Sequence, residues 1–163
     1  MKKWIVVALM LMGQLSIAQD VTTYYLIRHA EKDRTDPSNR DPHLTVVGQE
    51  RAENWQNVFN AVPFDRIYST PYHRTRETAQ PTATAKQLLV ESYDPRDLYN
   101  ASFKEKNKGK IVLVVGHSNT TPALANKILG REEYPQIDDH INGNLYIIQV
   151  SADGVTCQLL SIE

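Results

Sequence analysis

The run IVLVV at positions 111–115 is apolar at every residue, and it constrains the fold more than any other stretch of the chain. A strand with one face in water alternates apolar and polar residues, whereas a strand that is apolar throughout is buried on both faces. Such strands lie in the middle of parallel sheets that carry helices on both sides. The run therefore predicts an α/β domain whose sheet is covered twice.

Other runs fill in this sheet. The lengths and compositions typical of strands recur at residues 22–27, 66–69, 145–150 and 155–161. Ala152-Asp153-Gly154 is a turn signal between the last two runs, so it predicts a C-terminal hairpin and hence a mixed sheet. The predicted fold is a three-layer α/β/α sandwich around a mostly parallel, mixed sheet.

Two segments have the pattern of helices. Residues 45–62 place apolar side chains three and four positions apart, and Thr45 stands where a helix cap is needed. Residues 122–129 begin with proline and are followed by Gly130, an arrangement that favours a helix at both of its ends.

The first eighteen residues have the features of a secretory signal peptide. Two lysines precede an apolar run at positions 4–12, and Ser16 and Ala18 supply the small residues of a cleavage site. The run is shorter than the roughly 20 residues that span a bilayer, so we expect no stable membrane insertion after cleavage. We expect residues 19–163 to form a single domain that is exported to the periplasm or the extracellular space; an uncleaved anchor is the alternative.

The charge of the remaining chain excludes one class of partner. Without Lys2 and Lys3 of the leader it has 16 basic and 19 acidic side chains. Nucleic-acid binding needs a basic surface for the phosphate backbone, and this sequence has no basic stripe. Cys157 is the single cysteine, so the domain has no internal disulfide. Any phosphate must therefore be held by a local site.

Basic and histidine side chains follow the carboxyl ends of three predicted strands, where ligands bind in α/β sheets. Neutral imidazole can attack phosphorus, and guanidinium groups hold phosphate oxygens in pairs. A helix that starts soon after the third strand end adds free N–H groups. The three strand ends lead into Arg28 and His29, into His73 and Arg74, and through Gly116 into His117. If the strands are parallel neighbours, two histidines and two arginines converge on one phosphate pocket.

Four motifs surround these strand ends. They are LIRHAEK at 26–32, LTVVGQERA at 44–52, IYSTPYHRTRETA at 67–79 and VVGHSNT at 114–120. In their type and order they resemble the histidine phosphatase superfamily, which includes the phosphoglycerate mutases and the histidine acid phosphatases. The resemblance implies a phosphoglycerate mutase-like fold and a histidine phosphatase-like catalytic domain.

The same resemblance implies roles for individual residues. His29 would be the nucleophile that becomes phosphohistidine, and Arg28 and Arg74 would hold the phosphate. His117 would also contact the phosphoryl group and donate a hydrogen bond to it in the transition state. The implied reaction is two-step hydrolysis of a small phosphorylated substrate, with no metal and no cofactor.

Two departures from the family pattern concern this site. Ala30 stands where the family usually has glycine after its nucleophile, a change of one methyl group. The general acid that protonates the leaving group is not marked by any motif. Asp94 is the first candidate, and Glu91 and Glu31 are the others. Because the insertion typical of mutases is missing, the chain resembles a phosphatase more than a mutase.

Other interpretations remain open. A module that binds a phosphorylated ligand without turning it over would keep the same arginines and histidines. An esterase with Ser118 as nucleophile is suggested by GHSNT, which resembles the G-x-S-x-G elbow, although Thr120 replaces its last glycine. A metal site fits less well, since the histidines lack short ligand spacing.

Three histidines and one loop fall outside these assignments. His43, His73 and His140 carry no catalytic motif, so we expect them to be surface residues or supporting neighbours of the site. The segment 31–43 is half charged and contains two prolines, which predicts a loop. Since it follows the candidate nucleophile, it is a candidate lid or reader of the leaving group.

Overall fold

The computed structural model describes residues 21–163. The predicted signal peptide and its cleavage site lie outside this range. Within it, no helix is both long enough and apolar enough to cross a membrane.

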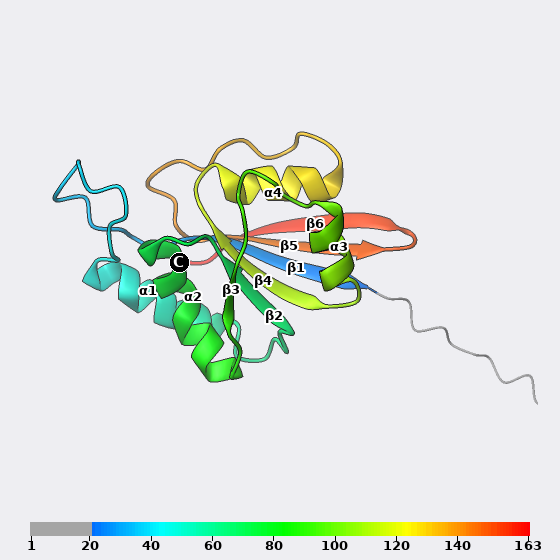
Figure 1. Cartoon of the computed structure of the whole chain (residues 1–163), viewed down its shortest axis with the longest axis horizontal. Coiled ribbons are helices and arrows are strands. Elements are labelled where there is room, and N and C mark those ends of the chain that lie inside the picture. Colours follow the sequence, from blue (N-terminus) through cyan, green and yellow to red (C-terminus); the bar gives the residue numbers. More distant parts are fainter. Residues whose placement is uncertain (1–20) are drawn as a thin grey trace, which may run out of the picture.

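One six-stranded sheet runs through the described residues, in the order β3-β2-β4-β1-β5-β6 (Figure 1). The strands are β1 (Thr22–Arg28), β2 (Arg66–Ser69), β3 (Val90–Ser92), β4 (Ile111–Gly116), β5 (Asn144–Ser151) and β6 (Gly154–Ser161). β4 pairs in parallel with β1 and β2, and β2 pairs in parallel with β3. β5 runs antiparallel to β1 and forms a hairpin with β6. The mixed, mostly parallel sheet and its C-terminal hairpin are as predicted.

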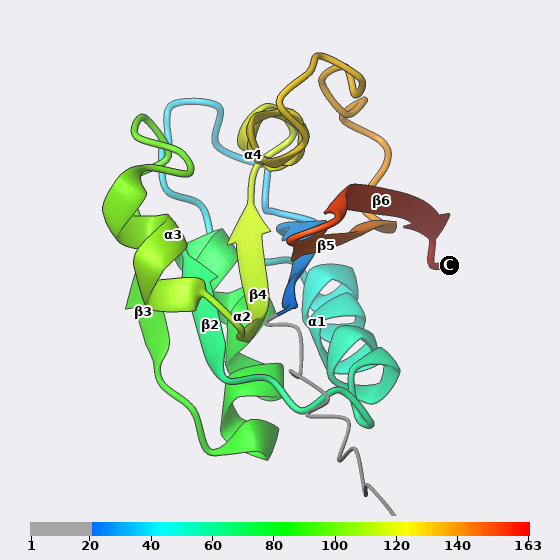
Figure 2. The ribbon, with the colours of Figure 1, turned by 90° about the vertical axis from the view of Figure 1, so that its right-hand side faces the viewer.

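Helices cover both faces of the sheet. α1 (Val46–Val58) and α2 (His73–Lys86) lie on one face, and α3 (Ala101–Asn107) and α4 (Thr120–Leu129) on the other (Figures 1 and 2). The apolar run of β4 serves both layers, because successive side chains of a strand point to opposite faces. Val112 and Val114 pack in the core under α4, whereas Leu113 and Val115 pack in the core under α1 and α2. The predicted three-layer fold is confirmed.

The two predicted helices form with shifted ends. Thr45 caps α1 and its hydroxyl accepts a hydrogen bond from the Gly48 amide at 3.1 Å, but the helix ends at Val58 rather than at residue 62. α4 starts two residues before Pro122 and ends at Leu129; the next residue, Gly130, has a φ of 70°, in the left-handed region.

Gly48 of the motif LTVVGQERA allows α1 to touch the segment that follows β1. A Cβ atom at this position would overlap the backbone carbonyl oxygen of Glu31. The same short segment is held by hydrogen bonds from Thr45 to the Glu31 carbonyl, with the backbone amide at 2.9 Å. The glycine therefore sets how closely α1 approaches the chain beside His29.

We expect Gly48→Ala to lower the free energy of unfolding by about 1–3 kcal/mol, because the added methyl group forces backbone apart. The sign is informative, since glycine to alanine inside an unobstructed helix stabilises by roughly 1 kcal/mol. Urea unfolding of the variant measures the change. Val47→Ala is the matched control, because Val47 is 56% exposed on the same helix. A more stable Gly48→Ala protein would contradict the contact.

Candidate active site

The pairing of β1 with β4 brings two histidines together. Arg28 is the register partner of Gly116, so His29 and His117 are the next residues on two adjacent parallel strands. The His29 amide donates a hydrogen bond to the Gly116 carbonyl at 2.9 Å, which continues the ladder by one step. The two imidazole rings meet edge to face, with centroids 5.4 Å apart.

Gly116 makes the turn from β4 into α4 sterically possible. A Cβ atom there would lie 2.7 Å from the Thr121 hydroxyl and 3.0 Å from the hydroxyls of Thr120 and Tyr93. The Thr120 hydroxyl accepts a hydrogen bond from the His117 amide at 2.9 Å and so fixes the turn. His117 is thus presented directly before the N-terminus of a helix.

The His29 side chain is buried, with 3% of its surface exposed. Its Nδ1 lies 2.7 Å from the Ala30 carbonyl oxygen, so we assign the proton to Nδ1 and leave the lone pair on Nε2. Burial lowers the pKa of His29 to about 3. The Ala30 carbonyl opposes this shift, while the charges of His117, Arg28 and Arg74 add to it. At neutral pH the ring is therefore uncharged.

His117 is held by a chain of hydroxyl groups. Its Nε2 lies 2.9 Å from the Thr70 hydroxyl, which lies 2.9 Å from the Thr75 hydroxyl. The Tyr72 ring meets the imidazole edge to face at 5.3 Å. Burial lowers the pKa of His117 to about 4, and the nearby positive charges of Arg74 and Lys32 lower it further. This histidine is also neutral in the free protein.

Arg28 is almost fully buried, with 2% of its surface exposed. Its Nη1 donates to the carbonyls of Asp138 and Ile141 at 2.8 and 2.9 Å. Its Nη2 donates to the Asp139 carboxylate at 3.0 Å. Its Nε is buried and has no hydrogen-bond partner among the described residues.

Arg74, in the first turn of α2, has the same incomplete hydrogen bonding. Its guanidinium lies 4.4 Å from the centre of the Tyr72 ring, and its Nη1 is 3.6 Å from the Asp41 carboxylate. Within residues 21–163 its buried Nε also lacks a partner. Arg76, two residues on, is exposed and its Nη2 reaches the Ser92 hydroxyl at 3.4 Å. The structure thus places Arg74, and not Arg76, beside the histidines.

These side chains line one open cavity at the carboxyl ends of β1 and β4. Four cationic residues line it against one carboxylate, Asp139. Burial pushes the pKa of Asp139 up, but the charges of Arg34 and Arg28 outweigh it and hold the pKa below its usual range. The start of α4 adds backbone N–H groups to the wall. The cavity is therefore built for an anion. The cations are Arg28, Lys32, Arg74 and Arg96.

Sequence reasoning missed Lys32, Tyr72, Arg96 and Asp139 as parts of this wall. Tyr72 stands inside a recognised motif, and its position beside Arg74 was the available signal. Lys32 ends the motif LIRHAEK, and its pKa is lowered by burial and by the charge of Arg74. Asp139 comes from a loop far along the chain, so no local pattern marks it.

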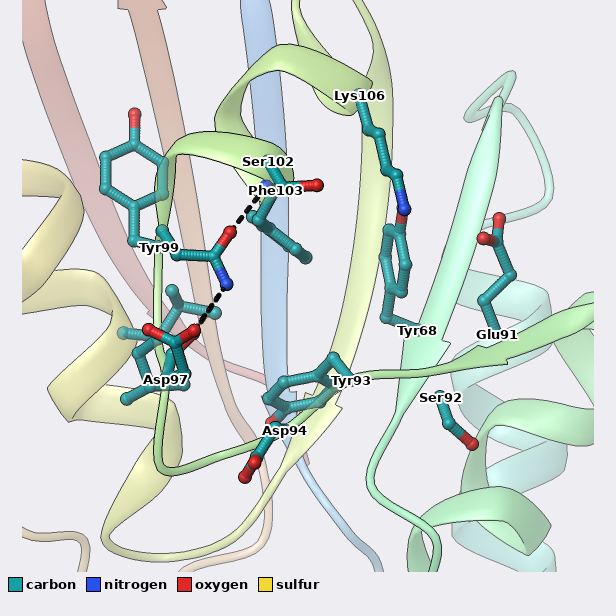
Figure 3. A pocket seen from close by; sticks show the side chains of 13 residues that line it. Tyr68, Glu91, Ser92, Tyr93, Asp94, Asp97, Tyr99, Ser102, Phe103 and Lys106 are labelled. Atoms are coloured by element: carbon teal, nitrogen blue, oxygen red, sulfur yellow. Dashed lines mark hydrogen bonds between the residues drawn. The ribbon is translucent and has the colours of Figure 1, made fainter.

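The carboxylates considered as general acid lie outside this cavity. Glu91 and Asp94 line a neighbouring pocket beside α3 (Figure 3). Asp94 is exposed, and its hydrogen bonds with Arg96, at 3.0 Å, hold its pKa below the usual range. Glu91 pairs with Arg66 at 2.7 Å, and Glu31 pairs with Arg51 at 2.8 Å. Asp94 and Glu91 do not line the cavity with the two histidines, whereas Glu31 lines an adjoining cavity with Arg28, His29 and Lys32.

The esterase interpretation finds little support in the geometry. Ser118 lines the cavity, but within residues 21–163 no hydrogen bond joins its hydroxyl to a histidine. His140 is exposed and its backbone amide donates to the Asp138 carboxylate. The described residues therefore do not form a hydrogen-bonded triad of Ser118, a histidine and an acid.

Comparison with known proteins finds a family match over part of the chain. A sequence model described as histidine phosphatase superfamily (branch 1) matches residues 24–96, which include Arg28, His29 and Arg74. Over these residues the chain is similar to this superfamily. A search of curated protein sequences finds no match to this histidine phosphatase-like chain.

Solved structures share the same fold at low identity. Protein histidine phosphatase SixA, complexed with tungstate, is 16% identical, with 85% of this chain and 96% of that chain covered and a TM-score of 0.68. The α-ribazole phosphatase of Shigella flexneri is 18% identical, with 86% and 96% covered and a TM-score of 0.64. A phosphoserine phosphatase mutant from Entamoeba histolytica, complexed with phosphoserine, is 16% identical, with 84% and 95% covered and a TM-score of 0.64. At these identities the similarity establishes the fold alone.

The lowered histidine pKa values predict a loss of stability in acid. Below about pH 6.5 the unfolded chain takes up protons at His29 and His117 that the folded chain does not bind, since their folded pKa values are about 3 and about 4. Each histidine should then cost up to about 1.4 kcal/mol of unfolding free energy per pH unit, down to its folded pKa.

Urea unfolding between pH 7 and pH 4.5 measures this dependence. We expect His117→Asn to lose less stability on acidification than the wild type, because one of the two linked groups is gone. His140→Asn is the matched control, since that histidine is exposed, and it should keep the wild-type slope. Equal slopes for wild type and His117→Asn would refute the assignment.

Proposed function

We propose that this protein is a metal-independent phosphatase that hydrolyses a small phosphorylated substrate through a phosphohistidine at His29. One observation carries the proposal. The neutral His29 and His117 line one cavity with the buried Arg28 and the partly buried Arg74, and each arginine has an Nε without a partner among the described residues. A phosphoryl group offers both the oxygens that these donors need and an atom that a neutral imidazole can attack.

In the first step, Arg28, Lys32 and Arg74 hold the phosphoryl oxygens, and the N–H groups at the start of α4 add to the same field. Nε2 of His29 attacks phosphorus, so that a P–N bond forms, the bond to the leaving oxygen breaks, and water protonates that oxygen. The bound dianion favours a protonated imidazole, so His117 gains a proton and donates a hydrogen bond to a phosphoryl oxygen. The charge that develops on the equatorial oxygens is thereby balanced.

In the second step, a water molecule attacks the phosphorus of phosphohistidine. The P–N bond breaks, inorganic phosphate leaves, and His29 returns to its neutral form. The hydrogen bond from Nδ1 to the Ala30 carbonyl keeps the same tautomer throughout. No metal ion is required, because the cationic side chains supply the positive charge.

Because the sequence predicts a signal peptide, we propose that the enzyme is exported and acts in the periplasm or the extracellular space. The similar structures are named for different substrates, among them phosphoserine, α-ribazole phosphate and protein phosphohistidine. These substrates have a phosphoryl group in common and differ in the rest of the molecule. The common group supports a phosphatase, whereas the leaving group that this protein prefers depends on the residues of its own cavity.

The first test of the proposal is the turnover of a generic aryl phosphate in the presence of a metal chelator. We expect His29→Ala to lower kcat by at least about 10³-fold, because the nucleophile is lost. Wild type quenched during turnover should carry an acid-labile, base-stable phosphoryl group, which His29→Ala should lack. His140→Ala is the matched histidine control and should keep wild-type activity.

Equal activity in wild type and His29→Ala would refute the mechanism. If neither turns over substrate while both bind orthophosphate, the chain is instead a phosphate-binding module. That second candidate is favoured by one observation: among the described residues, the one carboxyl group that lines the cavity is Asp139, and its pKa is lowered rather than raised.

The same observation predicts a steep dependence on the leaving group. Without a positioned acid, water must protonate the leaving oxygen, so esters of acidic phenols should react much faster than alkyl esters, with about 10²–10⁴-fold lost for lack of acid catalysis. The slope of log kcat/KM against leaving-group pKa measures this. Asp94→Asn and Glu91→Gln should leave that slope unchanged. A selective loss of poor leaving groups in Asp94→Asn would identify Asp94 as the acid after all.

A further inference from the structure

His43, His73 and Glu77 form a cluster outside the phosphate cavity. One nitrogen or oxygen from each side chain lies within 4.8 Å of the others, and the two imidazole rings stack with centroids 4.1 Å apart. We propose that this cluster binds a divalent transition-metal ion, with Zn²⁺ as the best match. The site is independent of the proposed catalytic step, since none of the three residues lines the cavity with His29 and His117.

The donor set suits zinc. Imidazole nitrogens and a carboxylate oxygen are its usual ligands, and three protein ligands leave one position for water. Two ligands of a tetrahedral zinc ion lie about 3.3 Å apart, given bonds of roughly 2.0–2.1 Å. The three side chains are therefore already near ligand spacing, and they are partly exposed and can adjust, at 64%, 54% and 32% for His43, His73 and Glu77.

The fold presents these ligands from two segments. His73 is the first residue of α2 and Glu77 follows one turn later, so the two project from the same helix face. His43 comes from the loop that follows β1, and its Nδ1 contacts the Glu77 carboxylate. Thirty positions separate the two histidines in the chain, which is why their spacing predicted no metal site.

The backbone of the two segments is tied together beside the cluster. The Leu44 amide donates to the second Glu77 oxygen at 2.8 Å, and the His73 amide donates to the Asp41 carboxylate at 2.8 Å. The ligands are thus held opposite one another before any ion arrives. Binding an ion would mainly replace the His43–Glu77 hydrogen bond, so little additional chain has to be ordered.

The charges around the cluster permit a cation. Glu77 contributes one negative charge, and Asp41 contributes another at 3.8 Å from Nε2 of His73. Arg74 is the cation that follows His73 in the chain. Its guanidinium lies over the Tyr72 ring and near Asp41, with its side chain 11% exposed, so it faces the phosphate cavity. The Asp41 carboxylate therefore contacts both His73 and this arginine.

The test is titration of the full chain, prepared without a polyhistidine tag and freed of metal by chelation, with Zn²⁺ and with Co²⁺. We expect calorimetry to show one Zn²⁺ per chain, and bound Co²⁺ to give the visible absorption of a tetrahedral site. The thermal midpoint should rise with Zn²⁺, because the ion binds the folded chain.

His43→Ala and His73→Ala should each weaken Zn²⁺ binding by at least about tenfold. Two matched controls separate this site from the others. His140→Ala removes an exposed histidine outside the cluster, and His117→Asn removes a histidine of the phosphate cavity; both should bind Zn²⁺ as the wild type does. If either cluster variant fails to fold, Glu77→Gln keeps the acceptor for the Leu44 amide and should still weaken binding.

Three results would overturn the proposal. If the wild type binds no Zn²⁺ at micromolar concentration, the cluster is only a hydrogen-bonded contact between loop and helix. If the cluster variants bind Zn²⁺ as tightly as the wild type, the ion binds elsewhere. If His117→Asn loses the ion while His43→Ala keeps it, the metal belongs to the histidine pair of the cavity.

Discussion

The parallel pairing of β1 with β4 is the interaction on which the rest of the site depends. It aligns Arg28 with Gly116, so the two residues that follow, His29 and His117, leave the sheet side by side. A slip of one residue would turn every side chain of β1 to the opposite face and separate the rings. The slip is prevented because β1 and β4 bury side chains on both faces, with Tyr24 and Leu26 under α4 and Ile27 opposite. The hydrophobic core thus fixes the position of the polar site.

The site concentrates positive charge that the fold only partly neutralises. Arg28 is buried and bonded to two carbonyls and one carboxylate, which offsets the cost of removing its charge from water. On the same wall Arg74 lies near Asp41 and Arg96 pairs with Asp94, while burial and the charge of Arg74 lower the pKa of Lys32. Such repulsion costs stability in the free protein and is relieved when an anion binds. The side chains that would bind the anion are therefore the same ones whose mutual repulsion lowers the stability of the free protein.

Sequence reasoning located what depends on strong local patterns. The apolar strands and their charged ends placed Arg28, His29 and His117 correctly at the edge of the sheet. α2 was missed because its buried face consists of Thr75, Thr78, Ala79, Thr82 and Ala83, which give no apolar periodicity. β3 was missed because its three residues, Val90–Ser92, are held mainly by pairing with β2.

The parts of the site that sequence could not supply come from loops brought close by the fold. Asp139 reaches Arg28 across 111 positions, and His43 reaches Glu77 across 34. No local signal carries such contacts, because each residue is ordinary in its own neighbourhood. Asp94 illustrates the converse, since a suitable residue in a suitable segment turns away and pairs with Arg96.

Burial of His29, which outweighs the opposing hydrogen bond from its Nδ1 to the neighbouring carbonyl, has a consequence for the lifetime of the phosphoenzyme. A ring that resists protonation is a weak base, and a weak base is a modest nucleophile but a good leaving group. The proposed P–N bond would therefore form with some effort and break readily when water arrives. Burial would in this way even out the two half-reactions, so that the covalent enzyme is present during turnover without persisting as a trap.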